Sequence, residues 1–190
     1  MTDTLTERPP QAAAQAPSAQ DLSIRILSAP EAGRDRLALA EVLADCVTGG
    51  ASVSFMWPFT TDDAHRWWGG VIDAVSAGTT VLFGAYLDGR LVGTVQLGLD
   101  VPPNQPHRAD VRKLLVHRDA RGCGIGAALM EALEAEAARR GLSLLTLDTA
   151  SGDAERLYRR LGWTAAGVIP RYALWPDGRF CDTTIFWKAL

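Results

Sequence analysis

Residues 109–126 read ADVRKLLVHRDARGCGIG, and the order of elements in this stretch decides the fold. The pattern predicts a strand over residues 109–116, a glycine-rich loop over residues 121–126, and a helix that continues to Arg140. Glycines between a strand and a helix let the backbone pass close to a ligand, and the free N–H groups of the first helical turn favour an anion. The loop is therefore typical of a pyrophosphate site. The alternative is a glycine-rich connection that binds nothing.

A second strand and a second helix follow this loop and its helix. We expect the strand over residues 142–149 and the helix over residues 153–161. A strand, a helix and a strand with short links predict a parallel pair joined by a right-handed crossover. Asp148 then lies at the carboxyl end of its strand, where parallel sheets bind ligands.

The loop also has to be compared with two nucleotide-binding motifs. A Walker A loop needs Gly-Lys-Ser/Thr at the start of the helix, and that sequence is absent. Gly122, Gly124 and Ala127 do satisfy the G-x-G-x-x-A fingerprint of dinucleotide-binding proteins, and Asp148 follows about 20 residues later. However, 42 residues (190 − 148) remain after Asp148. One short helix among them is too little for a doubly wound sheet. A nucleotide-binding oxidoreductase is therefore the rival interpretation of this loop and not the preferred one.

The remainder of the chain predicts strands and helices around this block. Ser28 and Glu31 form a capping-box signature for a helix that ends at Gly49-Gly50. A second helix begins near residues 60–63, and its internal Gly69-Gly70 pair requires that it be held by packing or kinked. Further strands are expected at residues 22–26, at 80–87 and 90–99 on either side of Asp88-Gly89, and within residues 163–190.

Two segments differ in amino-acid composition from the rest of the chain. Residues 1–20 have no apolar face and contain three prolines, which predicts a disordered N-terminal tail ahead of one domain over residues 21–190. Residues 49–60 read GGASVSFMWPFT, and a loop with so many large apolar side chains rarely faces water. We interpret this loop as a wall of the acceptor site and the Trp67-Trp68 pair as core.

Composition excludes several classes of function. The chain has 190 residues and a net charge of −3, which argues against nucleic acid as a partner because phosphates need a basic face. No apolar run approaches the ~18 residues of a membrane span. The three cysteines and three histidines show no metal-ligand spacing, so no metal is predicted, and the absence of a disulfide framework suits a cytoplasmic location.

Two motifs together carry a resemblance to a known superfamily. Arg121, Gly124 and Gly126 form R-x-x-G-x-G after a strand, and an A-x-x-L-Y-x-x-x-G-W motif runs from Ala154 through Tyr158 to Trp163. At these motifs the sequence resembles the GNAT superfamily of acyl-CoA-dependent N-acetyltransferases, over roughly residues 22–190. Segments such as GGASVSFM and PDGR…TTIFWKAL look like the tabtoxin-resistance group within it.

The resemblance implies the fold, the cofactor and the residues that bind it. The fold would be α/β, a single GNAT domain with a mixed, mostly antiparallel sheet flanked by helices. Acetyl-CoA would be the co-substrate. The family's loop binds the pyrophosphate, and its preceding strand binds the pantetheine arm. Here these are Arg121, Gly122, Cys123, Gly124, Ile125 and Gly126, and Leu114, Leu115 and Val116. The sequence departs from many members at Ser151, where they have asparagine.

Catalysis by such a protein needs an acid for the leaving thiolate and a group for the acceptor amine. The resemblance implies that Tyr158 is the general acid, whereas its helical spacing alone would suit a core tyrosine. A protonated amine cannot attack, so a carboxylate must orient or deprotonate it, and Asp148 is the first choice. Asp110 is the second candidate, with a paired structural role as its alternative. Cys123 at a helix start could be a nucleophile, but it fills a variable position of the loop.

These observations predict acetyl transfer from acetyl-CoA to a primary amine of a small molecule by direct attack in a ternary complex. A toxin or antibiotic-like amine would fit, as would an amino acid or a peptide. The rival from another class is a non-catalytic acyl-CoA-binding or sensor module, which would keep the glycine loop and lose the chemistry. The sequence leaves the oligomeric state open, with a homodimer among the alternatives.

Overall fold

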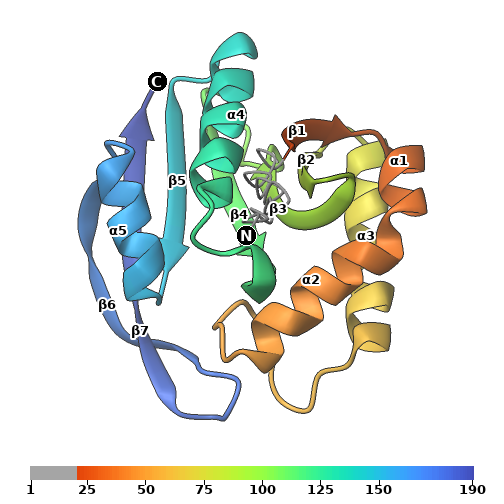
Figure 1. The fold of residues 1–190 in the computed structure, drawn as a ribbon. Helices are drawn as coiled ribbons and strands as arrows, with labels where there is room; N and C mark the ends of the chain where they lie inside the picture. Colours follow the sequence, from red (N-terminus) through yellow and green to blue (C-terminus); the bar gives the residue numbers. More distant parts are fainter. Residues whose placement is uncertain (1–20) are drawn as a thin grey trace, which may run out of the picture.

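The computed structural model describes residues 21–190, and the predicted tail at residues 1–20 lies outside them. Within the described residues the chain forms one seven-stranded sheet in the order β1-β2-β3-β4-β5-β7-β6 (Figure 1). Neighbouring strands are antiparallel except for β4 and β5, which are parallel. The expectation of an α/β domain with a mixed, mostly antiparallel sheet is confirmed. The same sheet overturns the dinucleotide-binding alternative, which needs a parallel, doubly wound sheet.

The elements follow the predicted order closely. The strands are β1 Leu22–Leu27, β2 Thr80–Leu87, β3 Arg90–Gly98, β4 Arg108–Val116, β5 Leu144–Thr149, β6 Thr164–Leu174 and β7 Phe180–Ala189. The helices are α1 Ala29–Arg34, α2 Arg36–Thr48, α3 Thr61–Ser76, α4 Ile125–Arg139 and α5 Gly152–Arg160, with a 3₁₀ turn, η1, at Arg118–Ala120.

Local signals account for several of these boundaries. Ser28 and Glu31 do form a capping box, which confirms the predicted start of α1. Asp88 and Gly89 both have positive φ, at 50° and 79°, so they close the β2–β3 hairpin with the turn that its right-handed twist prefers.

The first helical region differs from the expectation of one continuous helix up to Gly49. It divides at Asp35, which ends α1 and begins α2. The Asp35 carboxylate accepts a hydrogen bond from the Tyr86 hydroxyl. Arg36, the next residue, donates from Nε to the His65 carbonyl of α3 at 2.7 Å. These long-range contacts hold α1 and α2 at separate angles, which local spacing does not reveal.

The helix α3 is continuous through its glycine pair, so packing holds it. A Cβ added at Gly69 would lie 2.8 Å from Nη2 of Arg36, and the glycine therefore permits the close approach of α2. Trp68 on the same turn is fully buried and donates from Nε1 to the Leu39 carbonyl at 2.9 Å. The prediction that Trp68 belongs to the core is confirmed.

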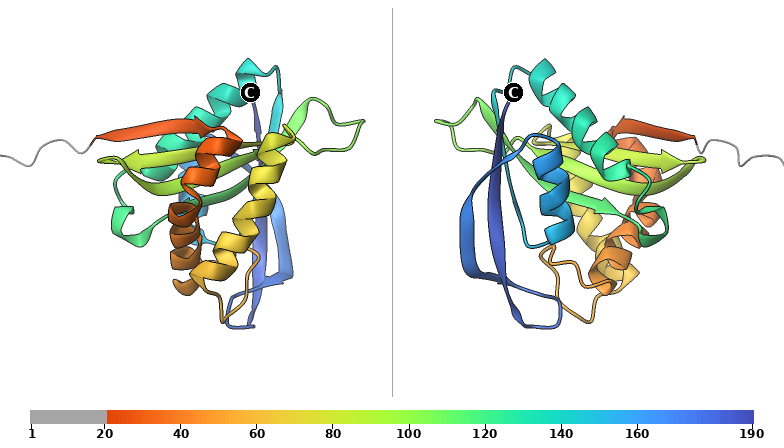
Figure 2. Two further views of the ribbon diagram at one scale, coloured as in Figure 1. Left: turned by 90° about the vertical axis from the view of Figure 1, so that its right-hand side faces the viewer. Right: turned by 60° about the vertical axis from the view of Figure 1, so that its left-hand side comes forward.

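Helices cover the two faces of the sheet separately (Figure 2). Helices α1, α2 and α3 pack on one face around Leu39, Leu43 and Trp68. Helix α4 packs on the other face through Leu129 and Leu133, and α5 adds Tyr158 to that core. Burial of these apolar faces, at roughly 25 cal/mol per Å², holds the layers together.

The strands β4 and β5 separate from each other after a short paired segment. Their register joins Arg108–Asp110 to Leu144–Thr146 and, within the described residues, extends no farther. Beyond that point β4 continues beside β3, while β5 continues beside β7. The sheet therefore opens between β4 and β5, and the later parts of both strands border the opening.

Candidate active site

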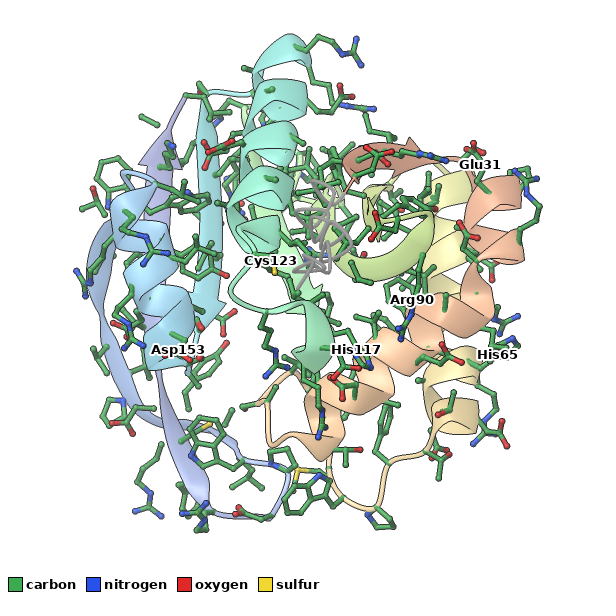
Figure 3. All side chains as sticks on the ribbon, in the orientation of Figure 1. Glu31, His65, Arg90, His117, Cys123 and Asp153 are labelled. Atoms are coloured by element: carbon green, nitrogen blue, oxygen red, sulfur yellow. The ribbon has the colours of Figure 1, made fainter. Side chains whose placement is uncertain are left out.

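A large cavity occupies the opening between β4 and β5. Its volume is about 1800 Å³. It brings together nearly all of the residues that the sequence singles out, which are Leu114, Leu115, Val116, Arg121, Gly122, Gly124, Ile125, Gly126, Asp148 and Tyr158. Two of the residues singled out do not line the cavity, namely Cys123, whose side chain is exposed, and Asp110, the second carboxylate candidate. Figure 3 labels Cys123 in the loop before α4 and Asp153, which does line the cavity, in the first turn of α5.

The glycine loop has the backbone shape of an anion cradle. Gly122 and Gly124 have φ values of 79° and 77°, in the left-handed region that favours glycine. A Cβ at either position would meet nothing within 4 Å, so the space beside this backbone is open. The first intrahelical hydrogen bond of α4 runs from Ala128 N to Gly124 O. The three N–H groups before it, of residues 125–127, are therefore available to a ligand at the helix start.

Asp45 on α2 holds the segment that leads into this loop. Its carboxylate accepts from the Arg118 backbone N–H at 2.9 Å and from the Arg118 guanidinium. It also lies 3.9 Å from Nη2 of Arg121. Arg121 in turn donates from Nε to the Val116 carbonyl at 3.0 Å. The Arg121 side chain therefore braces the end of β4. No sequence motif indicated this role for Asp45, because its partner Arg118 is 73 residues away.

The free edge of β4 presents backbone groups to the cavity. The Val116 carbonyl points to the β5 side, because it accepts from Arg121. The Leu115 carbonyl points to the β3 side, where a Cβ on Gly93 would lie 3.0 Å from it. Backbone groups alternate along a strand, so those of Leu114 face the cavity like those of Val116. An amide-bearing chain could pair with this edge as an extra strand would.

Tyr158 combines burial with access to the cavity. Only 5% of the residue is exposed, and its ring packs on Trp163 and Phe186 at centroid distances of 5.9 and 5.7 Å. Among the described residues its hydroxyl makes no hydrogen bond, and the residue lines the cavity. Burial raises the pKa of the phenol, and the negative charge of Asp148 raises it further. The phenol therefore keeps its proton at neutral pH, and the raised pKa also makes it a weaker acid than a phenol in water.

Asp148 stands at the end of β5 with its carboxylate exposed to the cavity. Its Oδ2 accepts from the Thr183 hydroxyl of β7 at 3.1 Å. That bond uses one acceptor position and leaves the carboxylate able to bind a cation or take a proton. Ser151, where many GNAT proteins have asparagine, also lines the cavity, and its side chain does not cap α5.

Asp110, the second candidate, serves a structural purpose. Its carboxylate accepts from Thr146 at 2.6 Å, from Arg108 at 2.5 Å and from Arg112 at 3.2 Å. Burial alone would raise the pKa of Asp110, but the hydrogen bonds from Thr146 and Arg108 outweigh it and lower the pKa. The residue lies where β4 and β5 still pair and does not line the cavity, so the paired alternative holds.

Sequence reasoning missed two residues on the opposite wall. Lys113 lines the cavity, and its Nζ lies 3.0 Å from the Ser54 hydroxyl. Trp67, which the sequence assigns to the core, also lines the cavity, and its ring stands edge-on to Phe55 at 5.4 Å. Phe55 does belong to the loop expected to form the acceptor wall. The pair of consecutive basic residues at 112–113, directly before the apolar run of residues 114–116, was the available signal for Lys113.

Comparison with known proteins identifies the family. The sequence model of the Acetyltransferase (GNAT) family matches residues 37–163, about two thirds of the chain. The chain belongs to this family of acetyltransferases, whose members generally use acetyl-CoA.

Solved structures share the fold over most of their length. An N-acetyltransferase from Staphylococcus aureus Mu50 is 20% identical with a TM-score of 0.73, covering 89% of this chain and 98% of its own. A ribosomal-protein-alanine N-acetyltransferase from Brucella melitensis is 24% identical with a TM-score of 0.70, covering 88% and 99%. yncA from Salmonella typhimurium, solved with its cofactor acetyl-CoA, is 22% identical with a TM-score of 0.69, covering 89% and 94%. At these identities the likeness concerns the fold.

The residues present fit the family's cofactor by their own geometry. The open backbone at Gly122 and Gly124 and the unpaired N–H groups of α4 suit a pyrophosphate. The free edge of β4 suits the amides of a pantetheine arm. Within the described residues, no helix has both the length and the apolar character needed to cross a membrane.

Proposed function

We propose that this protein transfers the acetyl group of acetyl-CoA to a primary amine of a small molecule, by direct attack in a ternary complex. The observation that carries the proposal is a single cavity lined by an anion cradle, a protonated tyrosine and a free carboxylate. Each of these has a separate task in acyl transfer. Packing explains the ring of Tyr158 but not its hydroxyl, which makes no hydrogen bond among the described residues.

The cradle and the strand edge would hold the donor. The backbone N–H groups of the loop and of the first turn of α4 would bind the pyrophosphate of acetyl-CoA, and Leu114 and Val116 would bind its pantetheine amides. Cys123 takes part through its backbone at most, because its thiol does not line the cavity. Acetyl-CoA supplies a thioester, whose carbonyl carbon accepts a nucleophile.

In the reaction, Tyr158 and Asp148 would each act on one proton. The acceptor nitrogen forms a C–N bond to the acetyl carbon while the C–S bond breaks, and the sulfur leaves with the bonding electrons. Tyr158 donates its phenolic proton to that thiolate. Asp148 orients the ammonium form of the acceptor or takes its proton, directly or through water. No side chain needs to carry the acetyl group between the two substrates.

The closure of one end of the cavity supports a small acceptor. The loop after α2 and the β6–β7 turn meet there (Figure 1). The Trp57 backbone N–H donates to the Pro176 carbonyl at 3.0 Å, and the Ser52 hydroxyl donates to the Leu174 carbonyl at 3.0 Å. Residues of both segments line the cavity. A toxin or antibiotic-like amine, as the tabtoxin-resistance resemblance suggests, would fit such a site. We also propose that the reaction takes place in the cytoplasm.

A screen of amines for acetyl-CoA-dependent thiol release tests the proposal. We expect thiol release that requires an amine and yields one acetylated amine for each CoA. A melting experiment with acetyl-CoA and with NAD as separate ligands should show stabilisation by acetyl-CoA alone. The alternative, a non-catalytic binding module, predicts the same melting shift with no thiol release for any amine.

A further inference from the structure

Lys113 lies on the wall of the cavity that faces α3, where neighbouring side chains hold its ammonium group. Its ammonium nitrogen is 3.0 Å from the Ser54 hydroxyl. It is also 5.7 Å from the ring centroid of Phe55 and 5.8 Å from that of Trp67, within range of a cation–π interaction with each. The side chain is half-buried and lines the cavity. Three residues from two other segments thus fix the position of one cation.

Two of the four non-glycine residues with positive φ among the described residues meet here. Ser54 has φ 80° and Lys113 has φ 52°, and neither is a glycine. The β3–β4 register shifts between Thr94 and Gln96, so β4 carries an extra residue opposite and bulges at this point. Strain of this kind has a free-energy cost and gathers at functional sites. The bulge turns the Lys113 side chain toward Ser54 and the aromatic rings.

The cation has no acidic partner of its own. Within residues 21–190 no carboxylate forms an ion pair with Lys113. Its neighbour Arg112 is already paired with Asp100 at 2.8 Å and Asp110 at 3.2 Å. Burial lowers the pKa of Lys113, and the charge of Asp148 opposes that effect without contact. A bound oxyanion would compensate for the hydration that Lys113 has lost.

Gln96 is a second unsatisfied donor on the same face of the sheet. Its neighbours Val95 and Leu97 turn into the core beneath α4, so Gln96 faces α3, as Lys113 does. Gln96 is 5% exposed and lines the cavity, and its Nε2 has no hydrogen-bond partner among the described residues. Buried amides are nearly always paired, so this group also points to a ligand with acceptor oxygens.

We propose that Lys113 determines acceptor specificity by binding a carboxylate of the acceptor, whose amine is held at Asp148 on the other side of the cavity. The acceptor is then an amino acid or a close analogue, with a cationic and an anionic end. This inference rests on the proposed acetyl transfer and adds the anionic half of the acceptor. Gln96 would contribute a further hydrogen bond to the same carboxylate.

The test compares acceptors with and without a carboxylate. Amino acids from glycine to 5-aminopentanoate are assayed for acetyl-CoA-dependent thiol release, each beside its own carboxamide. We expect kcat/KM for the amino acid to exceed that of its amide by tenfold to a hundredfold at one chain length or more, as a charge-assisted hydrogen bond gives. The enzyme is also prepared as Lys113→Met, which keeps the length of the stem, and as Lys113→Arg, which keeps the charge.

The two variants separate specificity from structure. Lys113→Met should lose the preference for the carboxylate, so that kcat/KM for each amino acid equals that for its carboxamide, while its melting shift with acetyl-CoA stays at the wild-type level. Lys113→Arg should keep the preference at least in part. Equal rates for acids and amides in the wild type, or an unchanged preference in Lys113→Met, would overturn the inference and leave the proposed function intact. A loss of rate on the carboxamides as well would give Lys113 a different role and would also overturn it. An absence of thiol release with every acceptor would instead contradict the proposed function.

Discussion

Asp148 and Tyr158 come from different elements and are electrostatically coupled across the cavity. Burial raises the pKa of the Tyr158 phenol, and the charge of the Asp148 carboxylate raises it further. The same carboxylate opposes the effect of burial on the pKa of Lys113. Asp148 therefore favours the protonated form of both groups. Acetyl transfer to an ammonium acceptor can use a protonated phenol as the acid and a free carboxylate as the base.

If the glycine loop binds the pyrophosphate, replacing Gly124 should lower the affinity for acetyl-CoA. Gly124→Ala would place a methyl group in the open space that the proposed pyrophosphate occupies. At acetyl-CoA one hundred times above Kd, the wild type should gain about 2.7 kcal/mol of stability. The variant should lose most of that gain, as measured by thermal melting with and without acetyl-CoA.

Gly141 provides a matched control for this substitution. It has the same φ of 77°, and a Cβ there would also meet nothing within 4 Å, but it lies after α4 and outside the cavity. Gly141→Ala should therefore lower the melting temperature of the free protein as much as Gly124→Ala, yet keep the full shift with acetyl-CoA. An equal shift in both variants would remove the cradle from the account.

The carboxylate of Asp148 predicts an effect on the acceptor and none on the donor. Asp148→Asn keeps the shape of the side chain and its hydrogen bond with Thr183 while it removes the charge. If Asp148 orients the amine, KM for the amine should rise; if it is the base, kcat should fall. In the second case part of the rate should return at high pH, because the amine then loses its proton to solvent.

Steady-state kinetics at several pH values measure both quantities. Asp73→Asn removes one negative charge from an exposed position of α3, outside the cavity, and serves as the control. If both variants kept wild-type KM and kcat over the whole pH range, Asp148 would have no part in the reaction.

We expect Glu136 to make the free energy of unfolding depend on pH, by a contribution unrelated to the active site. It is 7% exposed and accepts hydrogen bonds from Arg139 at 2.7 and 2.8 Å and from Arg140 at 2.7 Å. The bonds from Arg139 outweigh the opposing effect of burial and, with those from Arg140, lower its pKa from 4.5 to about 2. A lowered pKa stabilises the folded state above pH 4.5, and this contribution disappears as the pH falls from 4.5 toward 2.

Glu136→Gln should therefore flatten the fall of unfolding free energy in that pH window. Because the arginine partners are partly exposed, the change should be on the order of 1–2 kcal/mol. Chemical denaturation between pH 2 and pH 5 measures it, with Glu131→Gln, an exposed position of the same helix, as the control. A slope identical to that of the wild type would mean that the Glu136 cluster contributes nothing.

Most of the fold could be predicted from local signals. The positive-φ pair Asp88 and Gly89 and the capping box at Ser28 each depend on a few adjacent residues, and each formed as expected. The parallel pairing of β4 and β5 followed from a strand, a helix and a strand with short links. The break at Asp35 could not be predicted, because its causes, Tyr86 and His65, are distant in sequence.

The candidate site was predicted better in its backbone than in its side chains. The residue types of the loop indicated open backbone at Gly122 and Gly124, but they did not indicate where the thiol of Cys123 points. Trp67 was missed because helical spacing does not show that its ring borders the cavity. Lys113 was missed because β4 bulges beside it. Strand alternation assigns each residue to one face, and a bulge in β4 changes that assignment in a way that depends on the partner strand.

The most direct test of the central claim is the turnover of Tyr158→Phe, measured as acetyl-CoA-dependent thiol release. The substitution keeps the ring, and with it the packing on Trp163 and Phe186. Tyr86→Phe, which removes a phenol on the other face of the sheet, is the matched control. If Tyr158 is the general acid, kcat should fall by about 100-fold or more in Tyr158→Phe, with acetyl-CoA affinity unchanged and the control near wild type. Wild-type turnover in Tyr158→Phe would contradict that role and leave Tyr158 as a core residue beside a binding site.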